Sequence, residues 1–187
     1  MTQETTRVRQ VVDWGAALWA GIVSGFVFLG LNLVLTPYLT GMTASVFMRY
    51  LAAMILGTSV LPPPADSVTV PIILAALLVN FGLAIIFAIV LAIVTHQWGM
   101  IMGILVGALF GFALYFINLY AVMRLFPWFF ILQNSLFAVS HVIFGVVAGA
   151  VYEMLEVEKY VPVDDLPVNG VAVDDVVVES RMEATHG

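Results

Sequence analysis

Long runs without a charged side chain dominate the first 152 residues of the chain. Three charge-free windows extend from Trp14 to Met48, from Ser67 to Met123 and from Leu125 to Tyr152. Such windows can lie in hydrocarbon, because an unpaired charge at the centre of a bilayer costs about 2.5–3.5 kcal/mol. A span needs roughly 20 apolar residues, so the middle window holds two spans joined by a turn at 96–99. The pattern predicts four transmembrane helices.

Proline residues set the limits of these helices. Pro suits the first turn or the end of a helix and is costly in its middle, and Pro37, Pro71 and Pro127 fit such positions. We expect helices at Trp14–Thr36, Pro71–Thr95, Gly99–Val122 and Pro127–Met154. The fold class is therefore all-α, a polytopic membrane helix bundle at 14–154 between an N-terminal segment at 1–13 and a tail at 155–187.

A shorter apolar stretch, Val46–Leu56, separates the first two spans. It would be about 16–18 Å long as a helix, too short to cross the hydrocarbon core. We predict one short interfacial or re-entrant helix, with Ser45 as its N-cap and an apolar face formed by Phe47, Leu51 and Met54. The alternative is a tilted fifth span at Met42–Leu61, which would put the two termini on opposite sides.

Composition supports an integral membrane protein, since 63% of the residues are hydrophobic and only 10% are charged. Eleven of the eighteen charges lie in residues 153–187. This acidic tail repeats Val-x-Val-Asp-Asp at Val161–Asp165 and Val171–Asp175. Acidic segments with few aromatic residues are usually disordered, which we expect here, although alternating valines also suit a short strand on the edge of a partner.

Several kinds of site are not indicated by the sequence. With no Cys there is no disulfide, thiolate metal site or Cys nucleophile, and His96, His141 and His186 are too dispersed for a metal cage. No acid pair falls within the spans, so we predict no catalytic residues, no metal and no cofactor. The basic residues form no block that would bind nucleic acid.

Basic residues near the spans predict the orientation of the chain. Arg7 and Arg9 precede the first helix, which places the N-terminus in the cytoplasm by the positive-inside rule. Four spans return the C-terminus to the same side, where Lys159 follows the last helix. Arg49 and Arg124 then lie outside.

Small residues recur at four-residue spacing in the predicted helices. In lipid such rows permit close backbone contact between helices. The glycines of these rows are Gly99, Gly103, Gly107 and Gly111 in the third helix, Gly21 and Gly25 in the first, and Gly145 and Gly149 in the fourth. The rows either pack the four helices against one another or face a second copy or a membrane-protein partner.

Each predicted span contains one Asn, and the four lie at similar depth in the outer half of the membrane. They are Asn32, Asn80, Asn118 and Asn134, the last preceded by Gln133. Because an unsatisfied amide in hydrocarbon costs several kcal/mol, these side chains should face one another, a cavity or a ligand. We leave two interpretations open, which are hydrogen bonds between helices and a polar vestibule open to the outside.

His141 is expected near the middle of the fourth helix, in the same four-residue row as Gly145 and Gly149. It should therefore point into the bundle. Burial would favour the neutral imidazole, which suits either a proton relay or a structural hydrogen bond.

Three short motifs resemble those of a known protein group. They are RYLAAMILG at 49–57, LPPP at 61–64 and FPWF at 126–129. The chain is similar to a group of small bacterial inner-membrane proteins, some of which are labelled sodium:proline symporters. The resemblance spans about 14–152, implies the bacterial inner membrane and brings no catalytic residues. The chain is too short for the symporter fold of more than ten helices.

Two functions are compatible with these patterns. The first is a non-enzymatic accessory, assembly or structural subunit of a membrane complex. The second is a small oligomeric channel or transporter that uses the Asn residues and His141. Lipid is the expected environment in both, and a second copy or a membrane protein is the expected partner.

Overall fold

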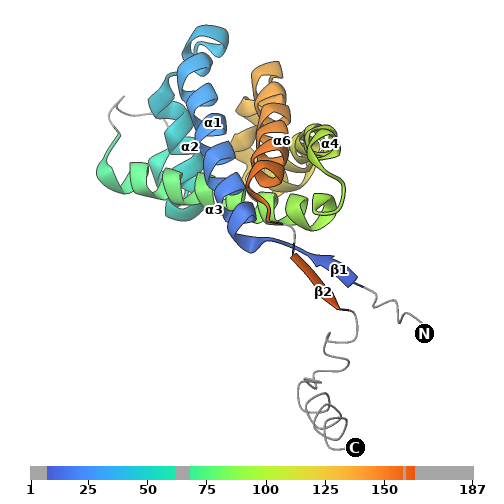
Figure 1. The fold of residues 1–187 in the computed structure, drawn as a ribbon. Coiled ribbons are helices and arrows are strands. Elements are labelled where there is room, and N and C mark those ends of the chain that lie inside the picture. The colour runs from blue at the N-terminus through green and yellow to red at the C-terminus, as the bar shows by residue number, and fades with distance from the viewer. Residues whose placement is uncertain (1–7, 62–67, 158, 163–187) are drawn as a thin grey trace, which may run out of the picture. The chain divides into compact units, whose positions relative to one another are not determined.

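A computed structural model describes residues 8–61, 68–157 and 159–162, and its helical unit at Asp13–Glu156 is the expected bundle (Figure 1). Four helical segments are long and apolar enough to cross a bilayer: α1 at Trp14–Thr40, α3 at Val70–Thr95, α4 with its extension at Met100–Leu125, and α6 at Ser135–Leu155. The all-α membrane architecture with one additional short helix is confirmed.

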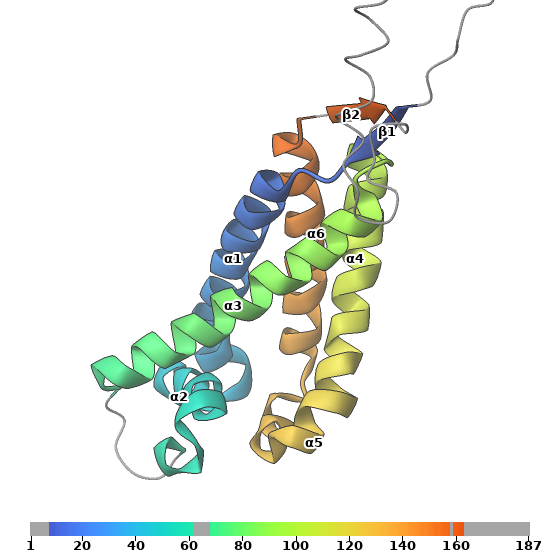
Figure 2. The same cartoon turned by 90° about the horizontal axis from the view of Figure 1, so that it is seen from below.

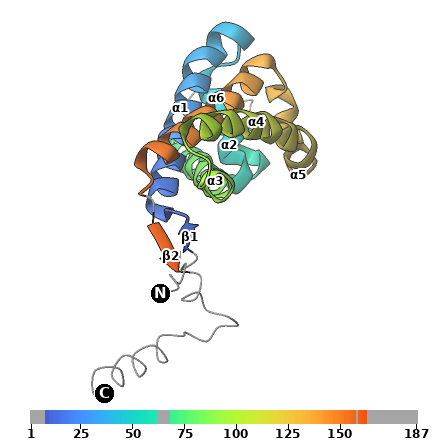
Figure 3. The ribbon, with the colours of Figure 1, turned by 45° about the vertical axis from the view of Figure 1, so that its right-hand side comes forward.

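The helix α6 lies at the centre of this unit. It packs between α1 and α4, while α3 crosses obliquely over the bundle and packs mainly on α1 and α2 (Figures 2 and 3). The start of α1 and the end of α6 are held together, because the backbone N–H of Asp13 donates to the hydroxyl of Tyr152 at 3.3 Å. The first and last spans therefore meet at one end of the bundle, which agrees with an even number of spans.

The first helix is longer than its proline suggests. The helix α1 continues through Pro37 and ends at Gly41, whose φ of 72° is the left-handed conformation typical of a helix C-cap. Pro37 removes one backbone hydrogen bond, and so close to the helix end this is tolerated. The predicted end at Thr36 was thus one turn too early.

The short helix α2 covers Ala44–Leu56, and its 13 residues extend about 20 Å, less than the hydrocarbon core of a bilayer. Gly57, with a φ of 82°, ends it, so the continuous helix that a fifth span at Met42–Leu61 would need does not form. Its N-cap is Thr43 and not Ser45, because the Thr43 hydroxyl accepts from the N–H of Val46. A single-turn 3₁₀ helix, η1 at Thr58–Val60, follows.

The predicted apolar face of α2 is buried against α3 and α1, with Phe47 and Leu51 almost fully covered. Arg49 is buried with them, and its Nη1 donates to the carbonyl of Val60 at 3.0 Å. The guanidinium therefore ties α2 by a hydrogen bond to Val60, the last residue of η1. The LPPP motif at 61–64 falls largely outside the described residues.

The last two spans differ most from the prediction. After α4 at Met100–Ile117 comes one π-helical turn, η2 at Asn118–Val122, and then α5 at Met123–Leu125. Pro127–Leu132 form a 3₁₀ helix, η3, so Pro127 does not begin the fourth span. That span begins at Ser135, because the Asn134 side chain accepts from the N–H of Phe137 and caps α6.

The chain contains a second compact unit outside the bundle. In its described part, β1 at Val8–Val11 pairs antiparallel with β2 at Lys159–Pro162, with Val8 opposite Pro162 and Val11 opposite Lys159. The beginning of the tail thus forms a strand, and its edge partner is the same chain. Residues 163–187, with the second Val-Asp-Asp repeat, lie outside the described residues.

Candidate functional site

His141 forms the polar centre of the bundle. It lies in the second turn of α6 and is 5% exposed. Its Nδ1 is 2.7 Å from the carbonyl oxygen of Phe137, and since a carbonyl only accepts, Nδ1 carries the hydrogen. In the neutral ring Nε2 is then an acceptor. Nε2 therefore accepts a hydrogen bond from the side-chain Nδ2 of Asn118, at 2.6 Å.

The partner of His141 lies where the Met100–Leu125 span changes its helical form. Asn118 is the first residue of η2, where the wider turn interrupts the regular hydrogen bonds of the span. Such turns are frequent at functional sites in helices. The pair links η2, directly after α4, to α6 through side chains, and the glycine contact of α4 with α6 lies on the same span.

Asn80 and Asn32 are buried, and both amides donate to backbone carbonyls. The Nδ2 of Asn80, on α3, reaches the carbonyl of Gly25 on α1 at 3.1 Å. The Nδ2 of Asn32 instead bonds within α1, to the carbonyl of Phe28 at 2.8 Å. Asn80 therefore ties two helices together, whereas Asn32 stays within its own helix.

The two remaining polar residues of the predicted cluster lie elsewhere. Asn134 caps α6 and so stands at the end of that span, not inside it. Gln133 is exposed and lines a second, small cavity of about 10 Å³ that Asn118 also borders. The structure thus brings Asn80, Asn118 and His141 together, and it does not bring Asn32 or Asn134 to them.

Aromatic rings surround the imidazole of His141. Phe137 lies one turn earlier on α6 with its ring centroid at 4.5 Å, and Phe28 of α1 approaches edge-to-face at 4.8 Å. The ring of Tyr115 on α4 lies at 6.1 Å. These contacts fix the ring plane of His141, so its two hydrogen bonds have a defined direction.

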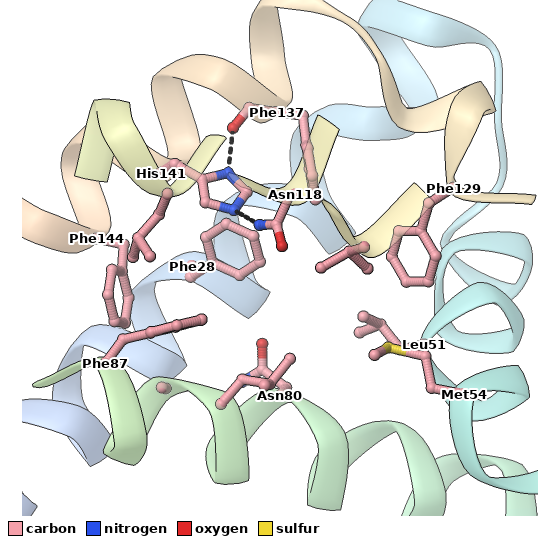
Figure 4. A pocket seen from close by; sticks show the side chains of 14 residues that line it. Phe28, Leu51, Met54, Asn80, Phe87, Asn118, Phe129, Phe137, His141 and Phe144 are labelled. Carbon is pink, nitrogen blue, oxygen red and sulfur yellow. Dashed lines mark hydrogen bonds between the residues drawn. The ribbon is translucent and has the colours of Figure 1, made fainter. Parts of the chain in front are cut away.

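A cavity of about 60 Å³ lies beside these aromatic rings. Figure 4 shows Asn118 and His141 on one side of it and Asn80 on the other. Its wall is contributed by α1, α2, α3, α4, η2, η3 and α6. The lining residues are Phe28, Leu51, Met54, Asn80, Leu83, Ala84, Phe87, Leu114, Asn118, Val122, Phe129, Phe137, His141 and Phe144. The wall is thus apolar apart from two amides and one imidazole.

Glycines of the predicted row in the third span bring α4 into backbone contact with α6. A Cβ added at Gly107 would overlap the carbonyl oxygen of Gly145, and one at Gly111 would overlap that of His141. A Cβ at Gly149 would overlap the carbonyl oxygen of Gly103. This row of glycines therefore faces α6, and the contact holds His141 opposite Asn118.

The glycines of α1 face a different helix. A Cβ at Gly21 would lie 2.6 Å from the Cα of Ile85, and one at Gly25 would lie 3.0 Å from the Cβ of Ala84, both on α3. Gly99 has no packing role of this kind, because nothing lies within 4 Å of its Cβ position. Its φ of 76° allows the turn before α4.

Sequence reasoning did not find the aromatic part of the site. Phe137, His141 and Phe144 share one face of α6 through spacings of four and three residues, which is a signal visible in the sequence. Phe28 of α1 and Phe129 of η3 come from distant segments, so no local pattern indicates them.

Comparisons with known proteins give no relative for this chain, because no family model, curated protein or solved structure matches it. Among the described residues, no group of three or more His, Cys, Asp or Glu side chains is placed to hold a metal. The arguments on function therefore rest on the geometry of the bundle.

Proposed function

We propose that this multi-pass membrane protein is a non-enzymatic accessory, assembly or structural subunit of a larger membrane complex. The observation that carries the proposal is an exposed ridge on the Met100–Leu125 span. In the most apolar stretch of this span 22% of the residues are buried in the bundle, compared with 50% in α6. Most of its surface is therefore free for lipid or for a neighbouring helix.

The ridge follows the three- and four-residue spacing of one helix face. Its members are Ile101, Leu105, Leu109, Phe112, Phe116 and Tyr120, all exposed. The rings of Phe112 and Phe116 meet edge-to-face at 4.9 Å, and those of Phe116 and Tyr120 stack at 6.4 Å. Aromatic residues are enriched at the centres of protein interfaces, and a row that is already ordered loses little entropy on binding. The partner that suits this ridge is a transmembrane helix of another protein.

The absence of Cys allows a direct crosslinking test of the ridge. Leu109→Cys places a thiol on the ridge, and Leu78→Cys is the matched control on α3, since the two leucines are 69% and 66% exposed. After thiol crosslinking in native membranes, we expect one discrete adduct from Leu109→Cys and none from Leu78→Cys. The adduct should disappear when Phe112 and Phe116 are both changed to Ala. Equal crosslinking at both positions, or none at either, would refute the proposal.

A small channel or transporter is the second candidate, and the convergence of Asn80, Asn118 and His141 on one cavity favours it. Asn32 and Asn134 are engaged elsewhere, so the four amides do not line one common path. Flux of protons or small solutes into proteoliposomes tests this candidate. Flux no higher than in empty liposomes between pH 5 and pH 8 would exclude it.

The cellular location is part of the same proposal. The basic residues before the first span and the resemblance to small bacterial inner-membrane proteins support the bacterial inner membrane with both termini in the cytoplasm. The contact between Asp13 and Tyr152 supports the first and last spans ending on the same side.

A further inference from the structure

We propose that the 60 Å³ cavity lined by α1, α2, α3, α4, η2, η3 and α6 is a binding site for the diol group of a neutral, lipid-soluble alcohol, with the side-chain oxygens of Asn80 and Asn118 as its two acceptors. The proposal goes beyond a subunit role and does not depend on it.

The orientation of Asn118 is fixed by a chain of hydrogen bonds. The carbonyl of Phe137 places the hydrogen of His141 on Nδ1, and Nε2 is left as an acceptor. The amide of Asn118 must therefore turn its Nδ2 toward Nε2. Its Oδ1 is then directed into the cavity, as Figure 4 shows.

Asn80 reaches the same arrangement from the opposite wall. The carbonyl of Gly25 only accepts, so the Nδ2 of Asn80 donates to it. The Oδ1 of Asn80 points into the cavity, toward the side on which Asn118 lies (Figure 4). Among the described residues, neither oxygen has a hydrogen-bond donor. Asn80 is 6% exposed and Asn118 is half-buried, and both face an otherwise apolar wall in which an acceptor without a donor costs free energy. The pair therefore favours a ligand that brings two donors.

The rest of the wall selects among possible donors. An ammonium ion would find no counter-charge, because none of the described residues that line the cavity is charged. A urea or amide would bring a strong acceptor of its own. The oxygen rather than the nitrogen of each Asn faces the cavity, so these two side chains offer that acceptor no donor. A neutral alcohol avoids both costs. Its two hydroxyls donate to Asn80 and Asn118, and its carbon atoms contact the rings of Phe28, Phe87 and Phe129.

The size of the cavity limits how much of the ligand enters. One water molecule needs roughly 10–15 Å³ of cavity volume, so the cavity of about 60 Å³ holds four to six non-hydrogen atoms the size of a water. A vicinal diol with its adjoining carbons has this size. A free alkanediol and the glycerol end of a monoacylglycerol share the chemistry, and they differ in whether a long acyl chain follows.

Binding of matched probes tests the proposal with the full-length protein in lipid nanodiscs. The probes are 1,2-hexanediol, 1-hexanol, which has one donor fewer, and 1-monooleoylglycerol. We expect 1,2-hexanediol or 1-monooleoylglycerol to bind. If the free diol is the ligand, 1-hexanol should bind about tenfold more weakly than 1,2-hexanediol, because it lacks one donor. Binding of the monoacylglycerol alone supports the lipid as the source. Equal binding of hexanol and hexanediol, or no binding of any probe, would overturn the proposal.

Three variants link the binding to the cavity. Asn80→Leu removes one acceptor and should lower the affinity about tenfold. Asn32→Leu is the matched control, because Asn32 makes the same kind of bond to a backbone carbonyl and does not line the cavity. It should leave the affinity unchanged. If Asn80→Leu does not fold, Leu83→Trp fills the cavity while both amides remain, and unchanged binding in that variant would equally overturn the proposal.

Discussion

The contact between α4 and α6 gives the sharpest test of the structure. Gly145→Ala adds one methyl group at a point where the added Cβ would lie 2.8 Å from the carbonyl carbon of Gly107 and 2.9 Å from the nitrogen of Gly111. Carbon atoms in good contact are about 3.5–4.0 Å apart, so the helices would have to separate by about 0.7 Å or more. Overpacking of this kind typically costs about 1–3 kcal/mol.

A matched glycine on α3 gives the opposite expectation. Nothing lies within 4 Å of a Cβ added at Gly82, so Gly82→Ala should gain about 0.5–1 kcal/mol from the better helix propensity of Ala. The two substitutions are chemically identical, and they should change stability in opposite directions because only one of them is at a helix contact.

Thermal unfolding of the purified protein in mild detergent measures both effects. For a chain of this size, 1–3 kcal/mol corresponds to a decrease in Tm of about 2–12 °C for Gly145→Ala. Gly82→Ala should unfold at or above the wild-type temperature. A Gly145→Ala protein that unfolds at the wild-type temperature, or the same shift in both variants, would show that α4 and α6 do not meet at backbone distance.

Three further predictions concern topology, the polar centre and the last span. Single Cys residues at Thr5, Ser67 and Ser180 should react with a membrane-impermeant thiol reagent on whole cells only at Ser67. Labelling of Ser180 would refute the cytoplasmic C-terminus. His141→Phe removes the bonds to Phe137 and Asn118, so thermal unfolding should shift down by the equivalent of about 1–3 kcal/mol; an unchanged Tm would argue against a structural role. Asn134→Ala removes the N-cap of α6 and should cost about 0.5–2 kcal/mol in thermal unfolding, whereas Asn134→Asp retains an acceptor and should stay near wild type. Equal loss in both variants would count against the cap.

The sequence by itself determined which segments are membrane helices. Hydrocarbon tolerates neither unpaired charge nor open backbone, so charge-free windows of sufficient length in the helical unit become spans wherever they occur. The short helix α2 was predicted for the same reason, since Val46–Leu56 is too short to cross. The rows of small residues were also visible, because the helical period places every fourth residue on nearly the same face.

Sequence alone did not determine which helices share those faces. Gly103, Gly107 and Gly111 meet α6, while Gly21 and Gly25 meet α3, and every such row looks alike before the helices are packed. The start of the last span also depended on a local competition. Pro127 begins only a 3₁₀ helix, and α6 begins at Ser135 because the Asn134 side chain caps it there. The position of the proline alone does not show which of the two residues begins the span.

The candidate site was decided by tertiary structure. The sequence placed one Asn on each predicted span, and their similar depth suggested that the four side chains would face one another, a cavity or a ligand. Depth fixes position along the bilayer normal but not the rotation of each helix about its axis. Packing sets that rotation, and it turned Asn80 and Asn118 toward the cavity while Asn32 bonded within α1. Asn118, the partner of His141, also begins a π-helical turn, an irregularity of the span that the sequence pattern did not predict.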